Sequence, residues 1–398
     1  MPWQPLLEGA TSAAAAEAVR SIAGALQQER PVSLGPSYAY GHSGLALFYG
    51  YLSIANGEES FEELAVSNLD QAADALSDSP CPLGLFLGLA GSAWASRHLD
   101  ELLTGTSSAE TTEEVDELIA EAVRVSPWRG DYDLVSGLAG LGFYALDHPD
   151  RKFAGEVIDQ ILRRLEELAL ERDGGLTWWT SPALMAPDTA ALYPDGYLNL
   201  GVAHGVPGVI GMLGQACARG IEEARRLLDG AVAWLLANRR PDDGGSSFTS
   251  YISPSDRAGS ATGCQSAWCY GDAGVAAVLL SAARSAGEPA WEREALAIAR
   301  RDCAAPPPEA VGTTFCHGAP GLGHLYNRLF QATDEEVFAD AARGWFERAL
   351  ADLARNPERG EEFVRFGIQE GMAGIGLALL AATSPVPPDW DRPFLFGV

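Results

Sequence analysis

Seven copies of Gly-x-x-Gly, each followed by an apolar run, constrain the architecture that this sequence can adopt. The intervals between successive first glycines are 47, 49, 68, 66, 47 and 53 residues. One such tetrapeptide carries little information, but seven at near-regular spacing indicate a repeat protein. The first glycines are Gly41, Gly88, Gly137, Gly205, Gly271, Gly318 and Gly371.

An amphipathic helical pattern precedes each of these glycine-rich, almost wholly apolar patterns. Apolar residues recur every three or four positions, with Glu and Arg between them. Because an apolar helix must be buried while an amphipathic one can face water, the sequence predicts an α/α toroid of seven inner and seven outer helices. An open α-solenoid is the alternative, since the sequence does not establish closure. The outer helices are expected at Ala13–Gln28, Phe61–Ser77, Thr112–Val123, Arg151–Leu170, Glu222–Leu236, Ala290–Arg301 and Glu335–Arg355.

The chain is therefore predicted to be all-α, since strand-like pairing is hardly visible, with a single domain over residues 1–398. Its 47% of hydrophobic residues can form a sizeable core. No apolar run approaches the roughly 18 residues that a bilayer-spanning helix needs. The N-terminus lacks the basic segment followed by an apolar segment that is typical of a signal peptide. We therefore expect a cytoplasmic protein without an integral membrane span. Six cysteines are too sparse for a disulfide scaffold, so reduced thiols are expected.

The charge balance narrows the possible partners. A formal net charge of −27 argues against nucleic acid, because binding phosphates requires clustered Lys and Arg. The same charge would suit a basic partner, and it would equally serve solubility or a salt-adapted proteome.

Aligning the repeats on their first glycines brings reactive residues into register. Cys269 and Cys316 both lie two residues before a first glycine, and His204 and His317 both lie one residue before. If all inner helices begin at the same end of the barrel, these side chains meet there. The positive end of each helix dipole favours thiolates and other anions at that end.

Two Cys and one His at such a junction form a sulfur-rich site suited to Zn²⁺. Three protein ligands with an open fourth position are typical of catalytic zinc, and four ligands are typical of structural zinc. Cys264, five residues before Cys269, is a candidate fourth ligand. Spacing alone leaves two alternatives, an open site of Cys269, Cys316 and His317 and a closed site that adds Cys264.

Other side chains and segments carry less weight. His204 is a functional candidate once a zinc site is accepted, and Asp133 lies four residues before the first glycine of the third repeat. The loops Asp173–Leu200 and Arg240–Cys264 account for the two longest intervals, and they are either the frame of a peptide groove or ordinary surface insertions. Rim or surface histidines are expected at His42, His98, His148 and His324, and inert thiols at Cys217 and Cys303.

Four short motifs resemble the lanthionine synthetase C (LanC) family of peptide cyclases. They are Trp-Cys-Tyr-Gly at Trp268–Gly271, Cys-His-Gly at Cys316–Gly318, Ala-His-Gly at Ala203–Gly205 and Tyr-Asp-x-x-x-Gly at Tyr132–Gly137. The glycine repeats extend the resemblance over nearly the whole chain. Each fragment alone is weak, whereas the first two, about 47 residues apart in an α/α repeat, form a specific signature.

The resemblance implies a toroid of 14 helices with one zinc ion and an open fourth coordination position. The family commonly has Arg four residues before its first zinc cysteine, whereas this chain has Gln265 there. Because glutamine carries no charge, substrate anchoring or enolate stabilisation by this position is in doubt. Carried over by motif, the zinc ligands are Cys269, Cys316 and His317, and the catalytic residues are His204, Asp133 and Tyr270.

The reaction implied is an intramolecular Michael addition in lanthipeptide biosynthesis. A peptide Cys thiol adds to dehydroalanine or dehydrobutyrine and closes a lanthionine or methyllanthionine thioether ring. Zinc would deprotonate the thiol, and His204 would protonate the α-carbon with Asp133 orienting it. Tyr270 would either donate a hydrogen bond to the enolate oxygen or only shape the pocket. Because the toroid fills the 398 residues, we expect a stand-alone cyclase. Its substrate would be a dehydrated precursor peptide, and its expected partners are a separate dehydratase and an exporter.

Three rival functions remain open. A LanC-like thiol-binding protein would capture glutathione or a peptide cysteine on the same zinc without closing a ring. A toroidal glycosidase or terpene cyclase would need paired carboxylates or an aspartate-rich motif, and the aligned positions offer chiefly Asp133 and Glu370. A purely structural zinc repeat protein is the third alternative.

Overall fold

The structure is a computed structural model of the chain. It describes residues 2–28, 34–78, 80–106, 112–241, 245–254, 264–305, 311–355 and 366–396. Within these residues, fourteen α-helices have nine or more residues and a fifteenth has six. By its internal contacts the chain divides into two compact units: residues 1–115 with 308–392, and residues 116–307 with 393–398. The expectation of one domain remains a prediction.

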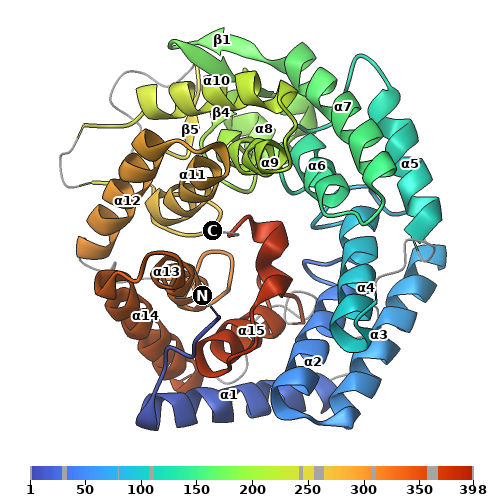
Figure 1. The fold of residues 1–398 in the computed structure, drawn as a ribbon, viewed down its shortest axis with the longest axis vertical. Coiled ribbons are helices and arrows are strands. Elements are labelled where there is room, and N and C mark those ends of the chain that lie inside the picture. Colours follow the sequence, from blue (N-terminus) through green and yellow to red (C-terminus); the bar gives the residue numbers. More distant parts are fainter. Residues whose placement is uncertain are drawn as a thin grey trace. The chain divides into compact units, whose positions relative to one another are not determined.

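The first unit contains four of the helices that follow a Gly-x-x-Gly start. They pack side by side in the order α13, α15, α2, α4, and amphipathic helices cover them, with α14 on α13, α1 on α15 and α3 on α2. The pairing of α1 with α15 brings the beginning of the chain beside its last long helix (Figure 1). The bounds are α1 (Gly9–Gln28), α2 (His42–Asn56), α3 (Glu59–Asp78), α4 (Leu89–Thr104), α13 (Ala319–Thr333), α14 (Glu336–Arg355) and α15 (Met372–Thr383).

The second unit repeats the same arrangement. Its apolar helices pack in the order α6, α9, α11, and each pairs with the amphipathic helix that follows it in the chain, α7, α10 or α12. Nearly all of α9 is buried, whereas α5 buries only the stripe Asp116, Ile119 and Val123, as an outer helix should. The bounds are α5 (Glu113–Arg124), α6 (Leu138–Leu146), α7 (Arg151–Leu168), α9 (Val206–Ala218), α10 (Glu223–Ala237), α11 (Asp272–Ala286) and α12 (Pro289–Ala304).

Five short strands lie in the second unit, where the sequence suggested almost none. They have two or three residues each, which is too short for an alternating pattern to be visible. Strands β1 and β2 form a hairpin, and β3, β4 and β5 form an antiparallel sheet within the two long loops. The bounds are β1 (Leu170–Arg172), β2 (Gly175–Thr177), β3 (Trp179–Thr180), β4 (Tyr197–Asn199) and β5 (Tyr251–Ile252), with the short helix α8 (Pro187–Leu192) between β3 and β4.

Every inner helix begins immediately after the first glycine of its repeat, because the preceding loop folds back on the helix start. In α13, the Ala319 N–H donates to the Gly312 carbonyl oxygen at 3.0 Å, so the loop satisfies a helix donor that otherwise lacks a partner. The loop is so close that a Cβ on Gly321 would lie 1.7 Å from the Phe315 carbonyl oxygen. The repeated glycines are therefore required by close backbone approach.

Backbone hydrogen bonds join the loops of neighbouring repeats at the aligned positions. In the first unit, Cys316 N–H donates to Gln369 O at 2.8 Å, and Gln369 N–H donates to Ala39 O at 3.2 Å. In the second unit, Val202 N–H donates to Cys269 O at 2.9 Å. Within each unit, these bonds confirm the predicted register, in which residues just before the glycines of adjacent repeats meet.

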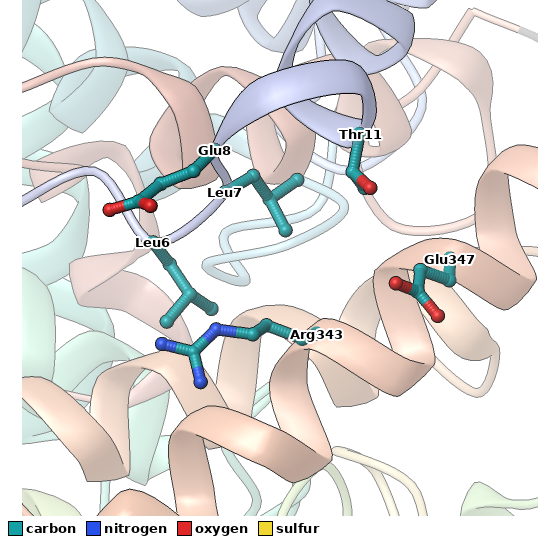
Figure 2. A pocket seen from close by; sticks show the side chains of 6 residues that line it. All are labelled: Leu6, Leu7, Glu8, Thr11, Arg343 and Glu347. Atoms are coloured by element: carbon teal, nitrogen blue, oxygen red, sulfur yellow. The ribbon is translucent and has the colours of Figure 1, made fainter.

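The N-terminal segment is anchored to the first unit. Leu6 and Leu7 are buried, and their N–H groups both donate to the carbonyl oxygen of Ala382 in α15. A pocket of about 290 Å³ remains between this segment and α14 (Figure 2). Arg343, which points toward Leu6 in that view, already pairs with Glu336 and Asp340, so its charge is compensated.

Candidate metal and acid–base site

Among the described residues, Cys269, Cys316 and His317 form a group with the composition of a metal site. Their two sulfur atoms and one imidazole nitrogen all lie within 4.8 Å of one another. Ligand atoms of a tetrahedral zinc site are roughly 3.5–3.8 Å apart, given Zn–S near 2.3 Å and Zn–N near 2.0 Å. Cys316 is buried, Cys269 is half-buried and His317 is exposed. The group could therefore bind a metal ion after small side-chain movements.

Cys264, the candidate fourth ligand, is not part of this group. Its Sγ accepts a hydrogen bond from the Ser250 hydroxyl at 3.1 Å and lies 3.4 Å from the Gln265 carbonyl oxygen. Burial raises the pKa of the Cys264 thiol, against the lowering effect of Ser250. These contacts favour the open, three-ligand alternative.

Gln369 supports Cys316 from the next repeat. Besides its backbone bond, Gln369 Nε2 lies 3.6 Å from the Cys316 Sγ, within hydrogen-bonding range for sulfur. The Gln369 side chain is buried, and its Oε1 has no hydrogen-bond partner among the described residues. An N–H donor spreads the charge of a thiolate and fixes its direction, as outer groups do around metal ligands. Like Cys269 and Cys316, Gln369 lies two residues before the first glycine of its repeat, but the sequence alone indicated no role for it.

His204 and Asp133 form a close pair. The His204 Nδ1 lies 2.5 Å from Asp133 Oδ2, and the other carboxylate oxygen accepts from the Ser136 N–H at 2.8 Å. The His204 side chain is 46% exposed and that of Asp133 is 7% exposed, so the Nε2 end of the imidazole faces outward from a buried anchor. Burial acts to lower the pKa of His204, but the hydrogen bond and charge of Asp133, helped by Asp131 and Cys269, raise it above its ordinary value. More of the imidazole is then protonated near neutral pH, as a general acid requires.

Asp131 adds a second carboxylate beside this pair. Burial and the charge of Asp133 raise the pKa of Asp131 to about 6, against the opposing effect of His204. Its backbone carbonyl also accepts from the Leu138 N–H at the start of α6, so its position is fixed by the same loop. Sequence reasoning missed Asp131, although it stands two residues before Asp133 in Asp-Tyr-Asp.

Tyr270 is held through its hydroxyl oxygen. Asn199 Nδ2 donates to that oxygen at 3.1 Å, and the Tyr251 hydroxyl donates at 3.2 Å. The ring lies against the backbone at Gly201, where a Cβ would come within 2.4 Å of it. Burial and the neighbouring Tyr251 raise the pKa of Tyr270 far above its ordinary value, so the hydroxyl stays protonated. The following residue, Gly271, has φ of 86°, a conformation that favours glycine.

Three of the four histidines that were predicted at the rim or surface are buried instead. His98 is partly buried and stacks on Trp94, and burial together with Arg392 lowers its pKa to about 3. Surface placement was wrong because a buried imidazole is stable where a polar side chain pairs with its ring nitrogen. The buried pairs are His42 with Asn68, His148 with Asp116 and His324 with Asp391.

A family model described as lanthionine synthetase C-like protein matches residues 32–395 of the chain. The chain belongs to the lanthionine synthetase C-like family. This membership confirms the resemblance that the four motifs suggested.

None of the helices in the described part of the chain combines the length and hydropathy that a membrane crossing requires.

One curated sequence and one solved structure are similar to this LanC-like chain. The nisin biosynthesis protein NisC of Lactococcus lactis subsp. lactis is 34% identical over 91 residues, which are 23% of this chain and 22% of NisC. The solved structure of nisin cyclase matches with a TM-score of 0.77 at 19% identity, over 95% of this chain and 97% of that one. At that identity the match establishes the fold, and the predicted all-α, α/α-toroid class is confirmed.

Proposed function

We propose that this LanC-like protein is a zinc-dependent lanthipeptide cyclase. It would catalyse intramolecular Michael addition of precursor-peptide Cys thiols to dehydroalanine or dehydrobutyrine, forming lanthionine or methyllanthionine rings. The observation that carries the proposal is the group of Cys269, Cys316 and His317, with Cys264 outside it. A structural zinc would be expected to have four protein ligands, whereas three leave a position for substrate.

Zinc fits this donor set better than other common metals do. Two thiolates and one imidazole form the soft, tetrahedral ligand set that zinc accepts, and hard cations prefer oxygen ligands. Cys269, Cys316 and His317 would hold the ion, with Gln369 directing the Cys316 sulfur. When bound there, Zn²⁺ would lower the pKa of the peptide thiol, so that the thiolate is available at neutral pH.

The His204–Asp133 pair would supply the proton that completes the addition. As the thiolate sulfur bonds to the β-carbon, the electrons of the double bond move into the peptide carbonyl and leave an enolate. The α-carbon then takes a proton from the exposed Nε2 of His204. Asp133, fixed by Ser136, holds the imidazole at Nδ1 and stabilises its charged form.

The substrate and partners follow from this chemistry. The substrate would be a dehydrated, Cys-containing precursor peptide, and a separate dehydratase would have to convert its Ser and Thr residues beforehand. An exporter of the finished peptide is a further expected partner. We propose no nucleic-acid partner, because the net charge of −27 opposes phosphate binding.

A thiol-binding protein without cyclase activity is the second candidate. The observation that favours it is Gln265, an exposed neutral side chain at the position where the family commonly has Arg. Such a protein would need the three metal ligands but not the His204–Asp133 pair. Replacing His204 therefore separates the two functions, because thiol binding would be retained while ring closure slows.

The test is to incubate the purified zinc-loaded protein with a synthetic peptide that contains one dehydroalanine and one cysteine. A cyclase removes the free thiol, measured by alkylation, while the peptide mass stays constant. Cys316→Ala should abolish metal binding and ring closure together, and His204→Ala should keep the metal but close rings slowly. Metal-dependent thiol binding without ring closure by the wild-type protein would replace the cyclase proposal with the second candidate.

A further inference from the structure

We infer that Asn199 and Tyr251 are positioning residues that turn the Tyr270 hydroxyl proton toward the substrate. The chemical consequence rests on the proposed cyclase function. The geometry itself rests on hydrogen bonds that lie within the second unit and involve no metal ion.

The small sheet brings the two donors together. Asn199 in β4 and Tyr251 in β5 are direct partners in the antiparallel register. Side chains of such a cross-strand pair lie on the same face, with Cβ atoms about 4.5–5.5 Å apart. Both can therefore reach one atom above that face, and that atom is the Tyr270 hydroxyl oxygen.

The direction of the Asn199 hydrogen bond is fixed by its other end. The Gly201 N–H lies 2.8 Å from Asn199 Oδ1, and a backbone N–H can only donate. The atom facing Gly201 must therefore be the amide oxygen, which leaves the NH₂ group facing Tyr270. Asn199 is fully buried, so this orientation is not exchanged for contacts with solvent.

The two donors occupy the accepting capacity of Tyr270. A phenol oxygen has two lone pairs and one hydrogen. With Asn199 and Tyr251 donating to the lone pairs, the hydrogen of Tyr270 must be donated elsewhere, and the incoming hydrogen bonds strengthen it as a donor. This arrangement favours the first of the two roles that the sequence left open for Tyr270, in which it donates a hydrogen bond to the enolate oxygen.

The acceptor we assign is the carbonyl oxygen of the dehydroamino acid, which becomes negative as sulfur bonds to the β-carbon. Tyr270 would donate a hydrogen bond to that oxygen and keep its own proton. The proton that ends on the α-carbon still comes from His204. Asn199 and Tyr251 touch neither atom and act only through Tyr270.

The test is a double-mutant cycle on ring closure with Asn199→Asp and Tyr270→Phe. In Asn199→Asp, a carboxylate oxygen replaces the NH₂ group and can only accept a hydrogen bond. The Tyr270 hydroxyl would then donate to that oxygen and no longer to the substrate. Each single variant should slow ring closure about 100- to 1,000-fold, as expected for losing one donor to an oxyanion. Asn199→Asp should cause little further loss when Tyr270 is already Phe. Independent, multiplying losses would overturn the inference.

A second variant avoids placing a carboxylate in a buried site. Tyr251→Phe keeps the ring packing and removes one donor, and it should slow closure about two- to tenfold, as for an ordinary hydrogen bond. Tyr193→Phe is the matched control, because Tyr193 packs on Tyr251 at 5.5 Å between ring centroids and belongs to the same aromatic cluster. The inference fails if the Tyr251 and Tyr193 variants behave alike.

A measurement independent of catalysis separates this inference from the proposed function. In protein labelled with ¹³Cζ-tyrosine, the Tyr270 resonance, assigned with Tyr270→Phe, should move in Asn199→Asp and Tyr251→Phe but not in Tyr193→Phe. If the wild type closes no ring yet these shifts occur, the cyclase proposal fails and the hydrogen-bond geometry stands. If rings close but the resonance does not move, the positioning role is refuted.

Discussion

Replacing Asp133 with Asn tests the acid–base pair while keeping its shape. The carbonyl oxygen of the new amide can still accept from the Ser136 N–H at 2.8 Å. Its NH₂ group then takes the place of Oδ2, which lies 2.5 Å from His204 Nδ1. Because that group can only donate, Nδ1 must accept, and the neutral imidazole is forced into the opposite tautomer.

The size of the effect follows from two contributions. Asp133 is the main influence that raises the pKa of His204, so the protonated fraction falls in the variant. The rate at pH 7 falls in proportion to that fraction. Losing the ring orientation removes a further part of the roughly 10²–10⁴-fold that general acids contribute. We expect ring closure to slow about 10- to 100-fold at pH 7.

The assay is the rate of thiol loss from a dehydroalanine peptide, measured across the pH range in which imidazole titrates. The acid works in its protonated form, so the rate falls as pH rises through the pKa of His204. Asp133 raises that pKa, so the fall should move to lower pH in Asp133→Asn. Zinc content is the control for folding. A fall in rate at the same pH as in the wild type, or an unchanged rate at pH 7, would refute the role assigned to the pair.

Three further predictions follow from single contacts. Cys316→Ala should lose bound zinc while Cys264→Ala retains it, measured as metal per protein, and equal losses would restore the closed site. Gly321→Ala should lower the free energy of unfolding, measured in urea, by at least about 2 kcal/mol, because the new Cβ would collide with the preceding loop. Gly344→Ala in α14 is the control, because its Cβ would contact no other atom, and it should change the free energy of unfolding by no more than about 1 kcal/mol. Gln369→Leu should weaken zinc binding about tenfold. It should also shift the thiolate-to-cobalt absorption of the Co²⁺-loaded protein to longer wavelength, because the Cys316 sulfur loses a hydrogen bond. An unchanged spectrum would exclude a hydrogen bond from Gln369 to that sulfur.

The helices were predictable because both signals that define them are local. The first glycines mark the starts of all seven inner helices. At six of them, all but Gly371, an added Cβ would lie within 3 Å of the backbone of the preceding loop. The outer helices follow from their apolar stripe, with boundaries within a few residues of those expected. Register then predicted the meeting of neighbouring repeats, which the backbone bonds of Cys316 and Val202 confirm within each unit.

The supporting residues were not predictable, because their roles depend on tertiary contacts. Asn199 and Tyr251 are 52 residues apart in the sequence and meet only through a sheet whose strands are too short to recognise. Gln369 stood in the aligned position, but glutamine carries no chemical signal of its own until Cys316 is seen 3.6 Å away. The burial of His42, His148 and His324 was not predictable for a similar reason, because their hydrogen-bond partners lie on other elements.

Zinc X-ray absorption on the purified protein, before and after adding a cysteine-containing peptide, would show whether the metal keeps a position open for substrate. We expect two sulfur ligands and one imidazole with a light atom in the fourth position, and a third sulfur once the peptide is added. Three protein sulfurs before the peptide, or a coordination shell that the peptide leaves unchanged, would contradict this expectation.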